Sequence, residues 1–243
     1  MSLPTLLHSK RNVVALNNMG VSLIERSAHS EAVAALKGSV SLMKQVYRDL
    51  HGQGGSENDS SRNEMMKDSL QRCSEALASV VCSRVSTDEI HAASTADPSL
   101  ANFLSLRESS STLLVPVKIE CSVEDIDNET LSSITLYNFG IAELVSSGTT
   151  SGPCMMRKLD VVDKIFALVL RILKNISEGV DVDPLVLFLA SMSSSYSSQI
   201  LRAQHRHTDA AQAESQATEL RQILLEFCKE HPWFKETVAA AAA

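Results

Sequence analysis

Turn-forming and aromatic residues are scarce in this sequence. Its 243 residues include only 9 glycines and 6 prolines, and aromatic side chains make up 4% of the chain. A β-sandwich or barrel needs many short strands joined by tight turns, and its strands are usually rich in aromatic and β-branched residues. Hydrophobic residues make up 44% and are dominated by Ala, Leu and Val. This balance favours helices that pack through small and aliphatic side chains.

Runs of basic residues and long apolar stretches are also missing. The net charge is −7, and no more than two Lys or Arg residues stand side by side. Contact with a phosphate backbone needs clustered positive charge, so we expect no nucleic-acid partner. The longest apolar run, around 165–173, is interrupted by Arg171 and is too short to cross a bilayer. We therefore expect no membrane insertion.

The cysteines and the opening residues bear on location. Five cysteines lie far apart without a Cys-x2-Cys spacing, which is typical of reduced intracellular thiols. The opening stretch MSLPTLLHSKRN has no long apolar core and no small-residue cleavage site, so a secretory signal is not expected. We predict an intracellular protein and favour the cytoplasm over an organelle.

Sequence motifs for catalysis are absent. The chain has no phosphate-binding loop, dinucleotide fingerprint, nucleophile elbow or zinc-protease helix, so we expect neither enzymatic activity nor a cofactor. The best metal candidates are His205 and His207 together with Cys228 and His231. If the last two helices pair, about 30 Å of helix separates these two groups, so no metal site is expected.

An acidic stretch at 124–129 (EDIDNE) has two interpretations. It could bind a cation or a basic partner. It could also be a solvated loop whose charge favours the N-terminus of the following helix, and this second interpretation is the one we favour.

Helical periodicity covers most of the chain. Apolar residues at three- and four-residue spacing predict a first helix from about 10 to 26. Ser30 is the expected N-cap of a second helix that ends near 50, and Asp183 followed by Pro184 marks the start of another. The only extended stretch is TLLVPVKIE (112–120), whose Pro116 favours a connector or a lone edge strand. Further helices are expected at 64–82, 129–147, 154–177, 184–205 and 208–230.

One stretch of the first helical pair has a specific spacing. Twelve residues separate Gly20 from Ala32, and the full pattern is Leu16-x2-Met19-Gly20-x2-Leu23 followed by Ala32-x3-Leu36. The small residues let two helices approach closely, and the larger ones fill the space between neighbouring pairs. This pattern resembles the tetratricopeptide repeat, in which Trp-x2-Leu-Gly-x2-Tyr precedes Ala-x3-Phe. The aromatic positions of the family are Leu in this chain.

Two further stretches resemble the same repeat. In one, Leu136-x2-Phe139-Gly140 repeats the motif, NFG (138–140) echoes NMG (18–20), and Phe166 matches the aromatic position of the partner helix. In the other, Leu189-x2-Met192-Ser193-x2-Tyr196 keeps the spacing with Ser in place of Gly. A plain helical hairpin with a small residue at its crossing would give a similar pattern. The echoed stretches, which cover about half of the chain with their partners, favour an array.

The resemblance implies an all-α fold of antiparallel helical hairpins, stacked as a short right-handed superhelix with long irregular insertions. A single domain over 1–243 is expected. Within it we predict a first repeat (9–50), a flexible loop (51–63), a helix (64–82), an irregular connection (83–128), a second repeat (129–177), a third repeat (183–231) and a tail (232–243).

The resemblance also implies a non-catalytic interaction or scaffold module that binds a peptide or protein segment on a groove. The alternatives are a permanent structural subunit of a larger assembly and, less favoured, an all-α enzyme or ligand carrier. Asn17 and Val21 stand where a chaperone-binding subgroup of the family has Lys and Asn, so docking of a chaperone C-terminus is not expected. Exposed positions on the first helix of each pair would bind the partner: Asn17, Val21, Ile24, Tyr137, Ile141, Ser194 and Ser197. Asn138, which matches one position of that chaperone-binding subgroup, is a further expected binding residue.

Overall fold

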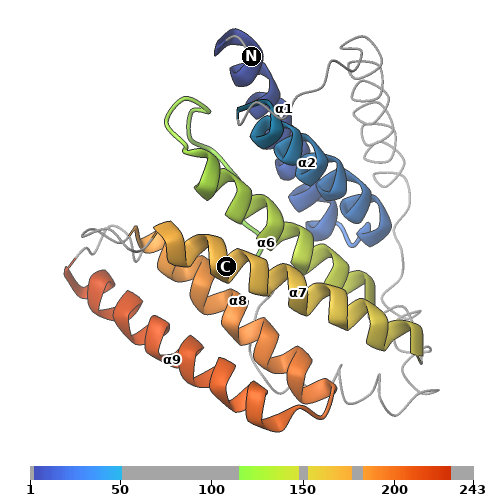
Figure 1. Cartoon of the computed structure of the whole chain (residues 1–243), viewed down its shortest axis with the longest axis vertical. Coiled ribbons are helices and arrows are strands. Elements are labelled where there is room, and N and C mark those ends of the chain that lie inside the picture. The colour runs from blue at the N-terminus through green and yellow to red at the C-terminus, as the bar shows by residue number, and fades with distance from the viewer. Residues whose placement is uncertain (1–2, 51–114, 148–152, 177–182, 231–243) are drawn as a thin grey trace. The chain divides into compact units, whose positions relative to one another are not determined.

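A computed structural model describes residues 3–50, 115–147, 153–176 and 183–230 (Figure 1). These residues form helices and connecting segments, and they contain no β-strand. The all-α prediction is therefore confirmed, whereas the right-handed superhelix stays a prediction. The helices are α1 (Leu3–Glu25), α2 (His29–Leu50), α6 (Asn128–Ser147), α7 (Pro153–Ile176), α8 (Pro184–Ala203) and α9 (His207–Glu230).

The chain divides into two compact units. The first comprises Met1–Glu89 and Pro116–Ser146, and the second comprises Ile90–Val115 and Ser147–Ala243. Among the described residues, unit 1 therefore holds α1, α2, the segment that precedes α6, and α6 itself, while unit 2 holds α7, α8 and α9. The expected single domain over 1–243 stays a prediction. The expected loop 51–63, the helix 64–82, most of the connection 83–128 and the tail 232–243 lie outside the described residues.

The first two helices begin earlier than the sequence pattern predicts. Helix α1 covers Leu3–Glu25, and Pro4 is compatible with its first turn because the N–H that proline lacks would have no partner there. Ser30 is not the N-cap of α2, so that prediction is wrong. The carbonyl of Ala28 accepts the hydrogen bond from the N–H of Ala32 at 2.9 Å, and Ser30 Oγ lies 3.1 Å from a carboxylate oxygen of Glu31.

The turn between α1 and α2 ends the first helix through a left-handed residue. Ser27 has φ 60°, its N–H donates to the carbonyl of Ile24 at 2.9 Å, and the N–H of Ala28 donates to the carbonyl of Leu23 at 2.9 Å. This pair of bonds defines a Schellman motif, which satisfies carbonyl groups that the end of a helix leaves free. Ala28 is thus both the last residue of the turn and the N-cap of α2.

The turn between α8 and α9 has the same construction. His205 has φ 60°, its N–H bonds the carbonyl of Arg202 at 3.0 Å, and the N–H of Arg206 bonds the carbonyl of Leu201 at 2.8 Å. The two hairpins therefore reverse direction in the same way. Matching the turns places Ser198 twelve residues before Ala210, as Gly20 stands twelve before Ala32. This register runs five residues later than one centred on Ser193.

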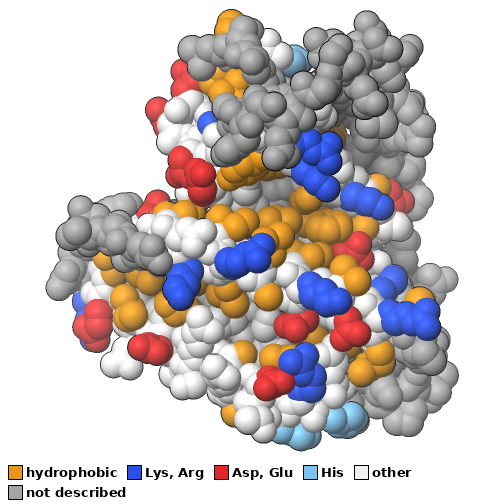
Figure 2. Space-filling model, in the orientation of Figure 1, with side chains coloured by type: hydrophobic (Ala, Val, Ile, Leu, Met, Phe, Trp, Pro, Cys, Tyr) orange, Lys and Arg blue, Asp and Glu red, His pale blue; other side chains and the backbone are white. Residues whose placement is uncertain are grey.

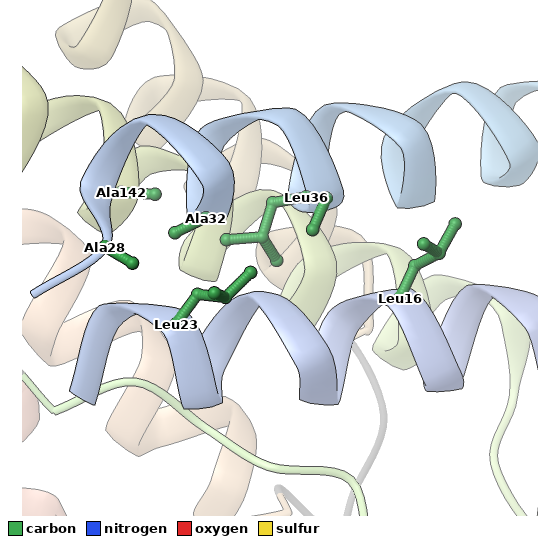
Figure 3. Close-up of a cluster of buried hydrophobic side chains, with 7 residues drawn as sticks. Leu16, Leu23, Ala28, Ala32, Leu36 and Ala142 are labelled. Atoms are coloured by element: carbon green, nitrogen blue, oxygen red, sulfur yellow. The ribbon is translucent and has the colours of Figure 1, made fainter. Parts of the chain in front are cut away.

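The close approach of α1 and α2 depends on Gly20. A β-carbon at this position would lie 2.4 Å from Leu36 Cγ and within 3.0 Å of both Leu36 methyl carbons. Figure 3 shows Leu36 reaching from α2 toward α1 between Leu16 and Leu23. These side chains form one buried cluster that α6 joins through Ala142. The sequence predicted this use of a small residue at the crossing.

Unit 2 packs α8 against both α7 and α9. Asp183 caps α8 as predicted, because its side chain accepts a hydrogen bond from the N–H of Leu185 at 2.8 Å with Pro184 in the first turn. The rings of Phe166 on α7 and Tyr196 on α8 lie with their centroids 5.3 Å apart. Helix α8 is buried along most of its length, and no helix in the described ranges is long and apolar enough to cross a membrane.

Candidate functional site: an asparagine cradle

Two asparagines from separate helices bind the main chain of an extended segment in unit 1. On α6, Asn138 Oδ1 accepts from the N–H of Val117 at 2.8 Å, and Asn138 Nδ2 donates to the carbonyl of Val117 at 2.7 Å. On α1, Asn18 Oδ1 accepts from the N–H of Ile119 at 2.8 Å, and Asn18 Nδ2 donates to the carbonyl of Ile119 at 2.8 Å. Each amide thus satisfies both main-chain groups of one residue.

A third asparagine joins the two helices. Asn17 Oδ1 accepts from Asn138 Nδ2 at 2.9 Å, while Asn17 Nδ2 lies 3.2 Å from Asn18 Oδ1 and 3.3 Å from the carbonyl oxygen of Val117. Asn17 and Asn138 are fully buried. A buried amide that loses its hydrogen-bond partner is costly, whereas one that is fully hydrogen-bonded stabilises the fold. These mutual bonds therefore hold the three side chains in one arrangement. We call Asn17, Asn18 and Asn138 the asparagine cradle.

The extended backbone explains why the cradle contacts alternate residues. In an extended chain, the N–H and C=O of one residue point to the same side, and those of the next residue point away. Val117 and Ile119 therefore face the cradle with their main-chain groups. Residues 115–120 form no strand, so the connector interpretation of 112–120 is correct for its described part and the edge-strand interpretation is not.

Charged side chains flank the cradle. Lys118 Nζ lies 2.8 Å from a carboxylate oxygen of Glu25 at the end of α1, and both side chains are partly exposed. Further along, Lys10 is buried and its Nζ donates to the carbonyl of Ile126 at 2.6 Å. This second anchor fixes the residues just before α6 independently of the cradle.

The acidic stretch 124–129 forms a solvated loop that begins α6. Asp127 Oδ1 accepts from the N–H of Thr130 at 2.7 Å, and Asp127 Oδ2 accepts from the Thr130 hydroxyl at 2.7 Å. Glu124, Asp125 and Glu129 are exposed. The stretch thus stabilises a helix N-terminus, which is the interpretation that the sequence favours.

A phenol at the contact of α2 with α6 has a shifted ionisation. Burial raises the pKa of Tyr47 above its usual 10.0, and the negative charges of Glu129 and Asp127 act in the same direction. A hydrogen bond with Ser132 works the other way and lowers the pKa. The neutral phenol is therefore the form that the fold favours.

The predicted binding residues are less accessible than expected. All but Ile24 are buried, and Ile24 is half-buried, so the expectation that these helix positions are exposed is wrong. The structure brings Asn17 and Asn138 together at the cradle, whereas Ser194 and Ser197 belong to α8 in unit 2. For Asn18 the sequence indicates only a position in the echoed NMG pattern. The signal that could have identified it is the echo of NMG by NFG, because Asn18 and Asn138 each bond the N–H and the C=O of one residue of the segment.

The metal candidates do not form a site in the described ranges. His205 and His207 are exposed, and their ring centroids lie 6.2 Å apart. The described residues contain no group of three or more His, Cys, Asp or Glu side chains that could hold a metal ion. The side chain of Cys228 and the whole of His231 lie outside the described residues.

On the face drawn in Figure 2, basic and acidic side chains are interspersed and do not separate by sign.

Comparisons of the chain with known protein families, with curated proteins and with solved structures found no match.

Proposed function

We propose that this chain is a non-catalytic interaction module that binds an extended segment of a partner protein through the asparagine cradle. One observation carries the proposal: the cradle holds the main chain of residues 117 and 119 as it would hold any extended peptide. Five hydrogen bonds from side-chain amides reach these two residues. Each contributes about 1 kcal/mol net when both partners are buried.

The resemblance to tetratricopeptide repeats supports the same proposal. In helical-repeat proteins of this kind, equivalent positions of successive repeats line an extended binding surface. Asn18 and Asn138 stand at equivalent positions of two echoed motifs and contact residues that are two apart in the bound segment. Successive repeats would thus each bond the main-chain groups of one residue, and the residues bonded would alternate along the peptide. β-strand addition binds the main chain of a peptide in the same alternating way.

Peptide selection tests the proposal. A random display library would be selected on the immobilised full chain and on a chain carrying Val117→Pro and Ile119→Pro, which lacks the two N–H groups that occupy the cradle. Selected peptides would then be titrated by fluorescence anisotropy against Asn18→Ala and Asn12→Ala, each made in the chain that carries the two prolines, so that residues 117 and 119 do not compete for the cradle. Asn12 is a matched control, because it is a half-buried asparagine of the same helix whose amide nitrogen has no partner among the described residues.

The expected result is a loss of affinity of about tenfold in Asn18→Ala, because one or two hydrogen bonds worth about 1 kcal/mol each are removed. Asn12→Ala should bind as the parent chain does. Failure to enrich any peptide on either chain would refute the proposal, and so would an equal loss of affinity in the two alanine variants.

A second candidate is a permanent subunit of a larger assembly. The observation in its favour is a set of large aliphatic side chains that are exposed in unit 2: Val161 at 50%, Ile223 at 48% and Leu225 at 62%. Exposed apolar side chains mark a contact between proteins where they form a contiguous patch, so this candidate requires that one partner surface cover these residues together. Under this proposal, the isolated chain would self-associate in size-exclusion chromatography, and Leu225→Gln would reduce that association. A monomer that is indifferent to this substitution would count against it.

A further inference from the structure

The main-chain groups of Val117 and Ile119 depend on the cradle. In the described part of the chain, their hydrogen bonds go to the side-chain amides of Asn17, Asn18 and Asn138 and to no backbone group. Helices and sheets hold their residues through cooperative ladders, but this segment is held side chain by side chain. It is bound in the manner of a ligand, although it belongs to the same chain.

The contacts do not depend on what the two residues are. Every hydrogen bond between the cradle and the segment reaches a main-chain N–H or C=O, which all residues except proline present in full. A peptide from another protein could therefore make the same bonds if its backbone were extended. The cradle by itself selects a conformation, and any preference for sequence must come from the side chains around it.

Those side chains describe the preferred sequence. Ile119 is buried, Val117 is half-buried, and Lys118 between them reaches outward to Glu25 at 2.8 Å. The alternation places aliphatic side chains on one side of the extended backbone and the basic one on the other. The bound pattern is thus aliphatic, basic, aliphatic.

Residues 116–120 can detach from the cradle while the start of α6 keeps its own contacts. Lys10 holds the carbonyl of Ile126, and Asp127 caps α6 through Thr130, so α6 is anchored downstream of the cradle. Residues 121–125, between the cradle and this anchor, are exposed except for Val123, which is half-buried. Opening of 116–120 therefore breaks the five hydrogen bonds to the cradle and one exposed ion pair, uncovers the buried side chain of Ile119, and leaves the start of α6 in place.

From these observations we propose that residues 116–120 are an intramolecular ligand of the asparagine cradle, and that a partner peptide with an aliphatic–basic–aliphatic pattern binds by displacing them. This inference rests on the proposed function, since it names the occupant of the same site and how access is controlled. Because the internal segment is tethered, it competes at an effective concentration that can reach the millimolar range. Weakening it should therefore strengthen binding in trans.

Hydrogen exchange on the wild-type chain gives the first test. The amides of Val117 and Ile119 should be protected, yet they should exchange at least tenfold faster than core amides of α1 and α6, such as those of Leu16 and Ile141. This ordering would show that the segment opens locally. Exchange of all four amides at one common rate, through global unfolding alone, would overturn the proposal whatever the variants do.

Peptide binding to the full chain gives the second test. The probe is a fluorescent peptide of residues 116–121 with Ser in place of Cys121, and its control carries N-methyl groups at the residues equivalent to 117 and 119. The control keeps every side chain and lacks the two N–H donors. We expect the probe to bind the Val117→Pro, Ile119→Pro chain at least tenfold more tightly than the wild type, and the N-methylated control to bind neither.

The outcomes separate this inference from the proposed function. Selected peptides that bind the wild type and the proline variant equally well would leave the interaction module standing and overturn the intramolecular ligand. Dimerisation of the proline variant through a segment other than 116–120, with no binding of the probe, would show a second copy as the occupant and overturn an external peptide. If the proline variant does not fold, as judged by circular dichroism, the exchange measurement on the wild type decides.

Discussion

Replacement of Gly20 by Ala should destabilise unit 1, although Ala is the better helix former. Alanine in a helix interior is favoured over glycine by about 1 kcal/mol. The added β-carbon, however, would lie 2.4 Å from Leu36 Cγ, whereas carbon atoms in contact are about 3.5–4.0 Å apart. The branch point of Leu36 cannot rotate away as a chain end can, so α1 and α2 must move apart.

The expected size of the effect follows from these two terms. Overpacking of a tight core site costs about 1–3 kcal/mol, and the helix preference returns about 1 kcal/mol, so Gly20→Ala should lose about 1 kcal/mol. For a chain of this length that corresponds to a fall in melting temperature of about 2–4 °C. Urea denaturation followed by far-ultraviolet circular dichroism would measure the change in unfolding free energy.

Ala15→Gly is the matched control, because Ala15 is exposed on the same helix. It should cost about 1 kcal/mol through helix preference alone. A double-mutant cycle with Leu36→Ala isolates the contact: in that background, Gly20→Ala should become stabilising, which gives a coupling of about 2 kcal/mol. The reasoning is refuted if Gly20→Ala stabilises the wild-type chain by the same amount that Ala15→Gly destabilises it.

Substitutions at three other positions test single features of the fold. Ser27→Gly should stabilise the chain by up to about 1 kcal/mol in thermal denaturation, because a left-handed conformation is costly for any residue with a β-carbon. Asp183→Ala should destabilise it by about 1 kcal/mol through loss of the cap on α8, and Asp183→Asn should recover most of that loss. Tyr47→Phe should weaken the fall of stability at alkaline pH. The folded chain holds the pKa of Tyr47 above 10.0, so the phenol stabilises the fold below that pH, and this stability is lost as the pH rises through the folded pKa. Urea denaturation between pH 9 and about 11 would show the difference, and parallel curves for the two chains would contradict it.

The helices and their crossing could be predicted because they depend on local patterns. Apolar spacing predicted the positions of all the helices in the described ranges to within a few residues, except for the early start of α1. The pair Asp183 and Pro184 is a local signal that acts within one turn, so it predicted the start of α8 correctly. Gly20 was predicted to allow close approach, and the contact with Leu36 is the physical basis of that prediction.

The turns could not be predicted in the same way. A helix that ends in a left-handed residue usually carries glycine or asparagine there, but this chain uses Ser27 and His205. Neither residue marks the end of a helix in a sequence, so the sequence pattern favours Ser30 over Ala28 as the cap of α2. The equivalence of the two turns, and with it the alignment of Ser198 with Gly20, follows only from the hydrogen bonds of the folded chain.

The cradle could not be predicted, because the Asn and the Gly of one short motif lie on different faces of the helix. Glycine stands two residues after asparagine in both NMG and NFG, and two residues correspond to a rotation of about 200° around the helix. In α1, Gly20 therefore faces α2 while Asn18 points away from it, toward the main chain of Ile119. The packing requirement accounts for Gly20 and leaves Asn18 unexplained, and the cradle accounts for Asn18. The two faces are separable by mutation. Asn18→Ala should weaken the hold on 116–120 and leave the α1–α2 crossing intact, whereas Gly20→Ala should strain the crossing and leave every cradle amide in place.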